Sequence, residues 1–118
     1  MARYATIKEN RDFSRIYRKG KSFVNPVLVT YVIKSRGDEP RYGITTGKKI
    51  GNAVKRSRAR RVIRAAYDAL YPQLHPGYDL IFVARGKTPH VKSTVVQKKM
   101  RQQLQQAGVL RQNSGEAS

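Results

Sequence analysis

The chain has 118 residues, a formal net charge of +18 and no cysteine. This length fits one domain with a modest core, and the lack of cysteine excludes disulfide frameworks, thiolate metal sites and cysteine nucleophiles. The first residues lack the apolar core of a signal peptide, and no stretch approaches the roughly 18 apolar residues of a membrane span. We therefore expect a soluble, cytoplasmic protein whose self-repulsion is relieved by an anionic partner.

Residues 10–20 show the spacing of a short amphipathic helix. Phe13, Ile16 and Tyr17 fall at i, i+3 and i+4, so their side chains share one face. Asn10 is of a type that caps helix N-termini, and Gly20 is a natural stop. The spacing predicts a first helix of about ten residues.

β-Branched and aromatic residues dominate the next part of the chain, which is typical of strands. Side chains alternate along a strand, and both alternating sets of the longest segment are largely apolar, so we expect both of its faces to be covered. A turn at residues 36–40 favours an antiparallel hairpin between the last two strands. The predicted strands are residues 23–24, 27–33 and 42–46.

Residues 47–64 form the most informative segment, because they carry eight Lys and Arg residues in eighteen positions. No Asp or Glu occurs from Pro40 to Tyr67, so no local carboxylate neutralises these cations and their field acts on a partner. The segment predicts a helix over residues 52–71, closed by Pro72, with an apolar arc and a separate arginine arc. The apolar arc is Ala59, Val62, Ile63, Ala66 and Leu70, and the arginine arc is Arg56, Arg60, Arg61 and Arg64.

The C-terminal part predicts one strand and one helix. Residues 78–84 are a largely apolar run, as in a strand buried on both faces, so we expect this strand inside the sheet. A helix over residues 92–107, with Gly108 as its stop, directs apolar residues inward. These are Val96, Met100, Leu104 and Ala107. The predicted fold class is α+β, a two-layer sandwich in the order αβββαβα, with one domain at 1–110 and a flexible tail at 111–118.

One motif runs through the third strand and the basic helix: Gly43-x4-Lys48-Lys49-x-Gly51-Asn52-Ala53-Val54-x-Arg56-x-Arg58-x-Arg60-Arg61-x-x-Arg64. It is accompanied by Asp12-Phe13-x3-Tyr17-x2-Gly20 in the first helix and by Phe82-Val83-Ala84-Arg85 at the end of the buried strand. Together these motifs closely resemble the protein subunit of bacterial ribonuclease P. Ser57 departs from the family's usual Asn, and Thr46-Gly47 from its usual small apolar and Ser pair; we expect both departures to be tolerated.

The resemblance implies a fold, partners and an activity. The fold would contain a left-handed crossover of third strand, basic helix and fourth strand, against the general preference for right-handed ones. In the family a large RNA holds the Mg²⁺ ions and removes the 5′ leader of precursor tRNA, and the protein is an auxiliary subunit of this ribonucleoprotein endoribonuclease. The implied partners are the catalytic RNA and the leader-bearing precursor, with no membrane and no obligate protein partner.

Phosphate binding is the predicted role of the basic segment. A solvated face would be the better interpretation of an ordinary charge run, but the depletion of acids favours a nucleic acid. Arg forks and Lys ammonium groups suit phosphate oxygens, and an Asn can add a polar contact or a helix cap. The predicted RNA-binding residues are Lys48, Lys49, Asn52, Lys55, Arg56, Arg58, Arg60, Arg61 and Arg64.

A leader-binding cleft is the second predicted site. Spacing alone slightly favours core packing for Phe13, Tyr17 and Tyr31. The resemblance implies that they line a cleft between the first helix and the sheet, where aromatic rings stack on single-stranded bases. Arg85 and Lys87 follow the buried strand and either continue the cationic track or form an exposed loop pair.

We assign no catalytic residue and no metal ligand to the polypeptide. His75 and His90 are too isolated for a metal site, and Asp12 and Asp79 fit helix-end and salt-bridge roles better than catalysis. A small ribosomal or structural RNA-binding protein would share the electrostatics but leaves the aromatic first helix unexplained. A protein nuclease would need a metal or acid-base cluster that the sequence does not suggest.

Overall fold

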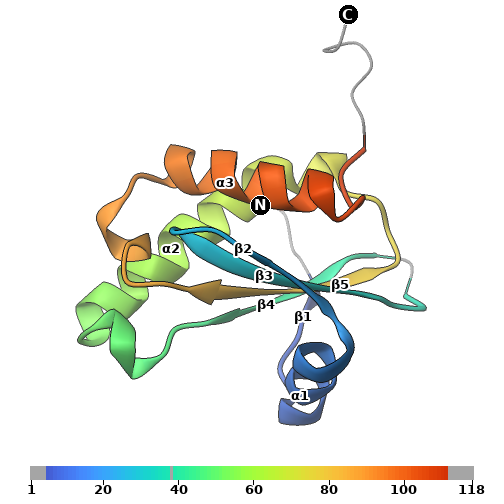
Figure 1. The fold of residues 1–118 in the computed structure, drawn as a ribbon, viewed down its shortest axis with the longest axis horizontal. Coiled ribbons are helices and arrows are strands. Elements are labelled where there is room, and N and C mark those ends of the chain that lie inside the picture. Colours follow the sequence, from blue (N-terminus) through green and yellow to red (C-terminus); the bar gives the residue numbers. More distant parts are fainter. Residues whose placement is uncertain (1–4, 38, 112–118) are drawn as a thin grey trace, which may run out of the picture.

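The computed structural model describes residues 5–37 and 39–111, which form one five-stranded sheet with α-helices on both faces (Figure 1). The predicted order αβββαβα is confirmed, and a two-residue strand precedes it. The elements are β1 (Ala5–Thr6), α1 (Asn10–Lys19), β2 (Lys21–Val24), β3 (Leu28–Lys34), β4 (Arg41–Thr45), η1 (Lys48–Ile50), α2 (Ala53–Leu70), η2 (Tyr71–Gln73), β5 (Tyr78–Ala84), η3 (Thr88–His90) and α3 (Ser93–Gln106).

The strand order is β1-β4-β5-β3-β2, so β5 lies at the centre as predicted. It pairs antiparallel with β3 and parallel with β4. The predicted hairpin between β3 and β4 is therefore wrong, because β5 inserts between them. A strand that is apolar on both faces needs neighbours on both sides, whereas the turn between β3 and β4 does not specify which strand either one pairs with.

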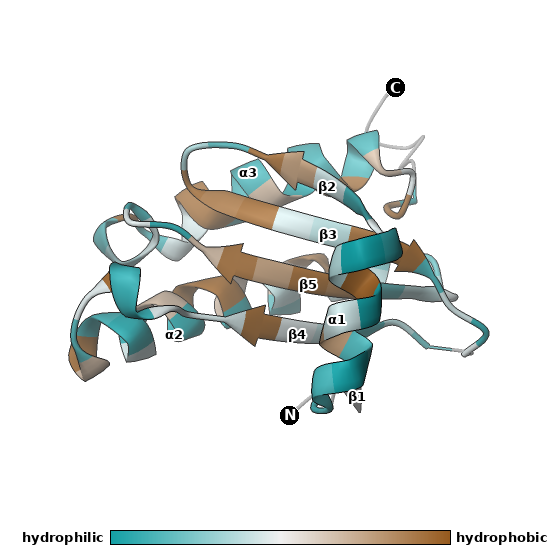
Figure 2. Cartoon of the chain, turned by 60° about the horizontal axis from the view of Figure 1, so that its bottom comes forward, coloured by the Kyte–Doolittle hydropathy of each residue, from teal (hydrophilic) through white to brown (hydrophobic). Residues whose placement is uncertain are grey.

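The connection from β4 through α2 to β5 joins two adjacent parallel strands. In Figure 2 both strands point the same way, β5 lies above β4, and α2 lies behind the sheet. Viewed from the helix side with the strands pointing up, β5 is to the left of β4. The crossover is therefore left-handed, the rarer hand for such a unit.

Helices cover the two faces of the sheet unequally (Figures 1 and 2). The larger core lies under α2 and α3 and includes the fully buried Tyr67 and Phe82, and burial raises the pKa of the Tyr67 hydroxyl. On the other face α1 buries Ile16 against Ile7 and Ile81. The sheet with α2 and α3 forms the predicted sandwich, and α1 adds a partial third layer.

The helix ends show which capping residues could be predicted from residue type. Asn52 caps α2, its Oδ1 accepting a hydrogen bond of 3.0 Å from the Lys55 amide. Asn10 was expected to cap α1, but Glu9 holds that position without a side-chain hydrogen bond. Gly20 ends α1 in an extended conformation, and a Cβ there would lie 2.5 Å from the Ile16 carbonyl oxygen. Close approach of the backbone therefore requires this glycine.

The end of the described chain returns to the body of the domain. Leu110 forms a β-bridge with Leu74, and the Arg111 amide donates a 2.7 Å hydrogen bond to the Gln73 carbonyl. The rest of the predicted tail, residues 112–118, lies outside the described residues.

Gln103 of α3 fastens the helix to the β2–β3 edge of the sheet from inside the core. Its Oε1 accepts a 2.6 Å hydrogen bond from the Thr30 hydroxyl. Its Nε2 donates to the carbonyls of Phe23 and Leu28, at 2.8 Å and 2.9 Å. Because Gln103 is only 3% exposed, these polar groups have little access to replacement water.

Replacing Gln103 with Leu should lower the free energy of unfolding by about 2 to 4 kcal/mol, since it removes three hydrogen bonds of a buried side chain, although the Leu28 carbonyl still accepts from the Asn25 amide. Urea unfolding followed by circular dichroism measures the change. Gln105→Leu, on an exposed position of the same helix, should change stability by about 0.5 kcal/mol or less. Equal effects of the two substitutions would show that the buried network contributes nothing specific.

Candidate nucleic-acid interface

The basic segment, residues 47–64 and hereafter the cationic segment, contains, just before α2, a turn that only glycine forms easily. Gly51 has a φ of +132°, and directly after it Asn52 caps α2. Lys48 and Lys49 lie in η1 and are exposed, while Ile50 between them and the helix is buried. The first turn of α2 contains no acidic residue, so the positive end of the helix dipole adds to these lysines.

Along α2 the predicted division into two arcs is confirmed. All five residues of the apolar arc are buried. Arg60, Arg61 and Arg64 are exposed, Lys55 is exposed in the first turn, and Arg56 is half-buried. Within residues 5–37 and 39–111, none of the segment's cations is within ion-pair distance of a carboxylate. Their charge is therefore available to an external anion.

Arg58 differs from the other arginines of the segment because it has a partner inside the protein. Its Nε donates a 2.6 Å hydrogen bond to the Pro89 carbonyl in η3. This bond ties α2 to the loop after β5, and the bond occupies one of the five N–H donors of the guanidinium. RNA binding by Arg58 remains a prediction, now alongside a structural contact.

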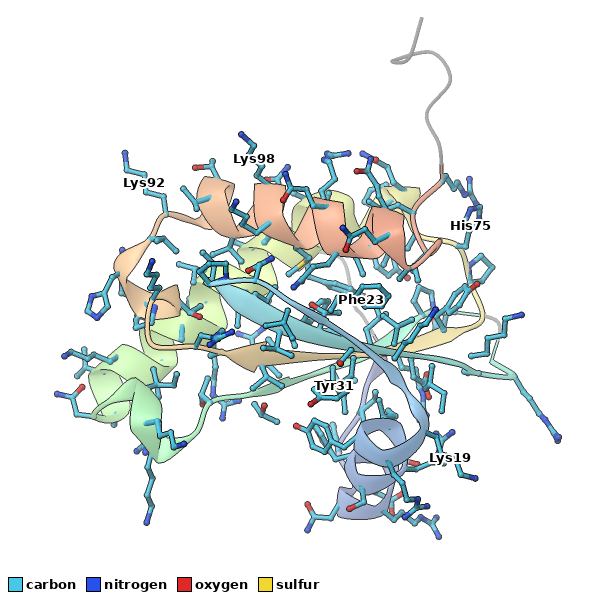
Figure 3. The ribbon with its side chains drawn as sticks, viewed as in Figure 1. Lys19, Phe23, Tyr31, His75, Lys92 and Lys98 are labelled. Atoms are coloured by element: carbon cyan, nitrogen blue, oxygen red, sulfur yellow. The ribbon has the colours of Figure 1, made fainter. Side chains whose placement is uncertain are left out.

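Phe13, Tyr17 and Tyr31 lie together on the α1 side of the sheet, where Figure 3 shows Tyr31 next to α1. The ring centroids of Phe13 and Tyr17 are 6.3 Å apart, and those of Tyr17 and Tyr31 are 4.9 Å apart with edge-to-face geometry. The Tyr17 hydroxyl lies 3.4 Å from Oγ1 of Thr45, and its side chain is 39% exposed. Phe13 and Tyr31 are half-buried and pack against the core around Ile16, whereas the exposed Tyr17 ring is free on one side to stack on a ligand.

Phe13 and Tyr17 border an open hollow of about 360 Å³ between α1 and the end of β4, and Tyr31 is not among its lining residues. Its lining residues are Asn10, Phe13, Ser14, Tyr17 and Thr45. Sequence reasoning missed Asn10, Ser14 and Thr45, whose polar side chains carry no signal by themselves. It also missed the role of Gly43, where a Cβ would lie 2.7 Å from Cζ of Phe13. A glycine inside a strand can signal such a close approach.

Arg85 and Lys87 follow β5 at the same end of the sheet as Thr45, because β4 and β5 are parallel and Thr45 is in register with Val83. Both are exposed. The Arg85 guanidinium donates a 3.2 Å hydrogen bond to the Asn25 carbonyl. By strand alternation Arg85 continues the face of Val83, the face on which α1 lies. Its guanidinium therefore reaches the turn between β2 and β3, and neither Arg85 nor Lys87 lines the aromatic hollow.

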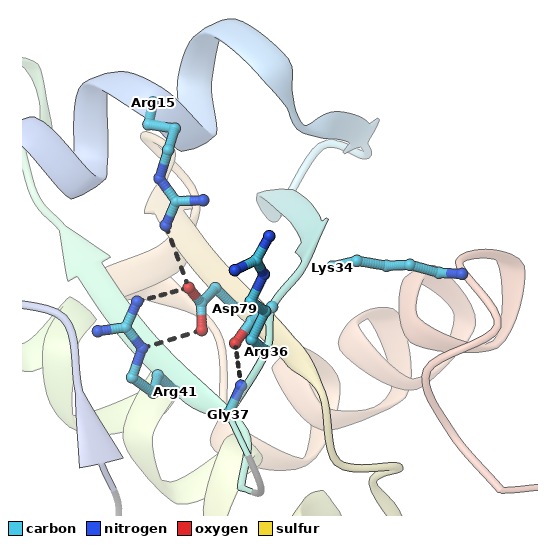
Figure 4. Close-up of a pocket in the computed structure, with 7 residues that line it drawn as sticks. Arg15, Lys34, Arg36, Gly37, Arg41 and Asp79 are labelled. Atoms are coloured by element: carbon cyan, nitrogen blue, oxygen red, sulfur yellow. Dashed lines mark hydrogen bonds and ion pairs between the residues drawn. The ribbon is translucent and has the colours of Figure 1, made fainter.

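A buried carboxylate fixes the other end of this face (Figure 4). Asp79 of β5 is fully buried and accepts hydrogen bonds of 3.0 Å and 2.6 Å from Nε and an Nη of Arg41 in β4. Arg15 of α1 approaches the same carboxylate at 3.5 Å and also lies 3.8 Å from Asp12. The hydrogen bond to Asp79 raises the pKa of Arg41. The predicted salt-bridge role of the two acids is confirmed, and their network links α1, β4 and β5.

Residues 5–37 and 39–111 contain neither a metal-binding cluster nor a membrane-spanning helix. No three His, Asp or Glu side chains come together there as a group that could hold a metal ion. No helix there is long and apolar enough to span a membrane.

The fold and the site define a small α+β protein with an unpaired cationic helix and an aromatic hollow at one end of its sheet. The family model described as Ribonuclease P matches residues 1–108. The chain therefore belongs to the ribonuclease P protein family.

Individual relatives agree with this assignment. The chain is 44% identical over 80 residues to the ribonuclease P protein component of Clostridioides difficile strain 630, covering 67% of this chain and 70% of the relative. It is 38% identical over 111 residues to that of Clostridium novyi strain NT, covering 92% and 98%. A solved structure of the Staphylococcus aureus RNase P protein superposes with a TM-score of 0.81 at 33% identity, covering 92% of this chain and all of that one.

Replacing Asp79 with Asn should lower the free energy of unfolding by about 2 kcal/mol, because two guanidiniums lose a buried partner but keep access to water. Amide hydrogen exchange in α1 should accelerate, since Arg15 is its link to the sheet at this end. The matched control is Asp68→Asn on an exposed position of α2, which should change stability by about 0.5 kcal/mol or less. Equal stability of the two variants would contradict the role of Asp79 in holding α1 to the sheet.

Proposed function

We propose that this chain is the protein subunit of ribonuclease P and acts in the removal of the 5′ leader from precursor tRNA. In this proposal the cationic segment binds the catalytic RNA, and the aromatic hollow with Arg85 and Lys87 binds the single-stranded leader. The observation that carries the proposal is that the two surfaces adjoin. Thr45, which lines the hollow, is three positions before Lys48, the first cation of the segment.

The two surfaces suit the two states of RNA that such an enzyme meets. Phosphates of a folded RNA are neutralised by Arg and Lys with release of counterions, which makes affinity fall steeply with salt. A single strand offers unstacked bases, and aromatic rings accept any base because every base has a π-face. The proposed recognition is therefore tolerant of leader sequence, which a processing enzyme with many substrates requires.

The polypeptide contributes binding and not bond cleavage in this proposal. The partner RNA holds the Mg²⁺ ions and performs the hydrolysis, as the family resemblance implies. Cations of the protein reduce repulsion between the phosphates of substrate and catalytic RNA, so fewer Mg²⁺ ions are needed to bring them together. We propose a cytoplasmic location, since precursor tRNA and its processing RNA meet there.

Cleavage of a leader-bearing precursor tRNA by bacterial ribonuclease P RNA at low Mg²⁺ tests the proposal directly. We expect stimulation only when protein and RNA are combined. A known subunit serves as the positive control, and protein alone as the negative one. No stimulation where the known subunit acts would favour a structural RNA-binding protein, and cleavage by the protein alone would place chemistry in the polypeptide.

Two substitutions of Tyr17 separate stacking from hydrogen bonding. Tyr17→Ala in the holoenzyme should weaken binding of leader-bearing precursor about tenfold, because one base–ring stack is worth roughly 1 to 3 kcal/mol, and should leave binding of leaderless tRNA unchanged. Tyr17→Phe should lose about twofold or less, since it removes only the hydroxyl contact to Thr45. Binding of both RNAs by filter retention measures the effects. Equal losses for the two substitutions, or for the two RNAs, would contradict leader stacking.

A further inference from the structure

The outer edge of β4 is only partly covered by another strand. β1 pairs with Arg41 and Tyr42 alone, and the Ile7 amide adds a 2.8 Å hydrogen bond to the Tyr42 carbonyl. The N–H and C=O of a residue in a strand point to the same edge, and successive residues alternate. Since the Tyr42 carbonyl points outward, the N–H and C=O of Ile44 do so too. Among the described residues, no strand extends along this edge as far as Ile44.

Two arginines of α2 flank this open edge. Arg60 and Arg64 are one helical turn apart, both are exposed, and no carboxylate in the described ranges pairs with either. Together with β4 and the chain after β1 they enclose a hollow of about 160 Å³. It is lined by Thr6, Ile7, Tyr42, Gly43, Ile44, Arg60 and Arg64.

The groups around this hollow match the backbone of one ribonucleotide. Guanidiniums and a main-chain N–H are the donors that phosphate oxygens accept from in proteins. A main-chain carbonyl needs a donor instead, and the 2′-hydroxyl is the donor that RNA has and DNA lacks. An added peptide strand would fit less well, because β4 ends at Thr45 and offers such a strand the edge groups of one residue only.

We propose that this hollow binds one nucleotide of an RNA strand. Arg60, Arg64 and the Ile44 N–H hold its phosphate, and the Ile44 carbonyl accepts from its 2′-hydroxyl. The proposal rests on the function proposed above, in that the ligand is RNA, and it adds a site at which the protein distinguishes RNA from DNA. The RNA strand is either the leader or the catalytic RNA.

The site adjoins the aromatic hollow across β4. Gly43 borders Phe13 on the face covered by α1, Ile44 lies at the outer edge, and Thr45 lines the hollow. A strand bound at one place is therefore close to the other.

The main-chain prediction is tested by nuclear magnetic resonance of the full chain labelled with ¹⁵N. On titration with a short single-stranded RNA, the Ile44 amide should shift and exchange more slowly with solvent. The DNA of the same sequence should produce a smaller change. The amide of Ile81, bonded at the centre of the sheet, is the internal reference. An Ile44 amide that RNA leaves unchanged, or that DNA affects equally, would overturn the proposal.

A pair of double variants tests whether Arg60 and Arg64, by binding the phosphate, hold the 2′-hydroxyl at the Ile44 carbonyl. Arg60→Gln with Arg64→Gln should weaken RNA binding about tenfold and bring the RNA and DNA affinities together. Lys92→Gln with Lys98→Gln removes the same charge from the α3 side of the molecule (Figure 3) and should retain the preference for RNA. An unchanged preference in the arginine variant would overturn the proposal.

Two further comparisons show which RNA occupies the site and whether the site can fail independently of the proposed function. If the leader occupies the site, the arginine variant loses affinity for leader-bearing precursor alone, and if the catalytic RNA does, it loses affinity for that RNA. Either loss supports the site when the same RNA also shifts the Ile44 amide of the unmodified protein. Stimulated cleavage with an unaffected Ile44 amide would overturn the site alone. Absence of any stimulation by the unmodified protein would overturn both proposals.

Discussion

The central position of β5 is the constraint on which the rest of the structure depends. Its residues are buried on both faces, so the strand needs a neighbour on each side and helices above and below. Because β4 pairs with it in parallel, the chain must cross from the end of one strand to the start of the other, and α2 is that connection. The segment with the most positive charge is thus held rigidly over the core by its apolar arc.

Parallel pairing also determines where the candidate sites lie. The C-terminal ends of β4 and β5 meet at one end of the sheet, which brings the turn before Lys48 to the same end as Arg85. At the opposite end the N-terminal residues Arg41 and Asp79 face each other in register. One end therefore carries neutralised charge that stabilises the fold, and the other carries cations that no carboxylate among the described residues neutralises.

Much of the fold could be predicted from periodicity, because helices and buried strands leave a strong pattern in the sequence. The apolar arc of α2 and the interior position of β5 are of this kind. Strand pairing could not be predicted in the same way: alternation in β3 and β4 shows that they are strands but not that β5 separates them. The left-handed crossover came from family resemblance, against the physical expectation.

The candidate site was predictable to a smaller extent, for a related reason. The absence of acidic residues around α2 is visible in the sequence, so the cationic surface could be predicted without the structure. The aromatic rings are at spacings that a core would share, and their exposure depends on how α1 lies on the sheet. The partners that fix α1, such as Arg15 with Asp79, are 64 residues apart in sequence. No local sequence pattern indicates a contact between residues so far apart in the chain.

The alternation of β4 explains how so short a strand can serve several roles at once. Tyr42 points into the larger core and stacks on Tyr67 with ring centroids 4.3 Å apart, while Gly43 leaves room for Phe13 on the other face. Ile44 returns to the larger core with its side chain, and its main chain lies at the open edge. The five residues of β4 all pair with β5, whereas the two-residue β1 covers only Arg41 and Tyr42. An open strand edge favours pairing with another chain, and here the positive charge of the flanking Arg60 and Arg64 disfavours such pairing with a second copy.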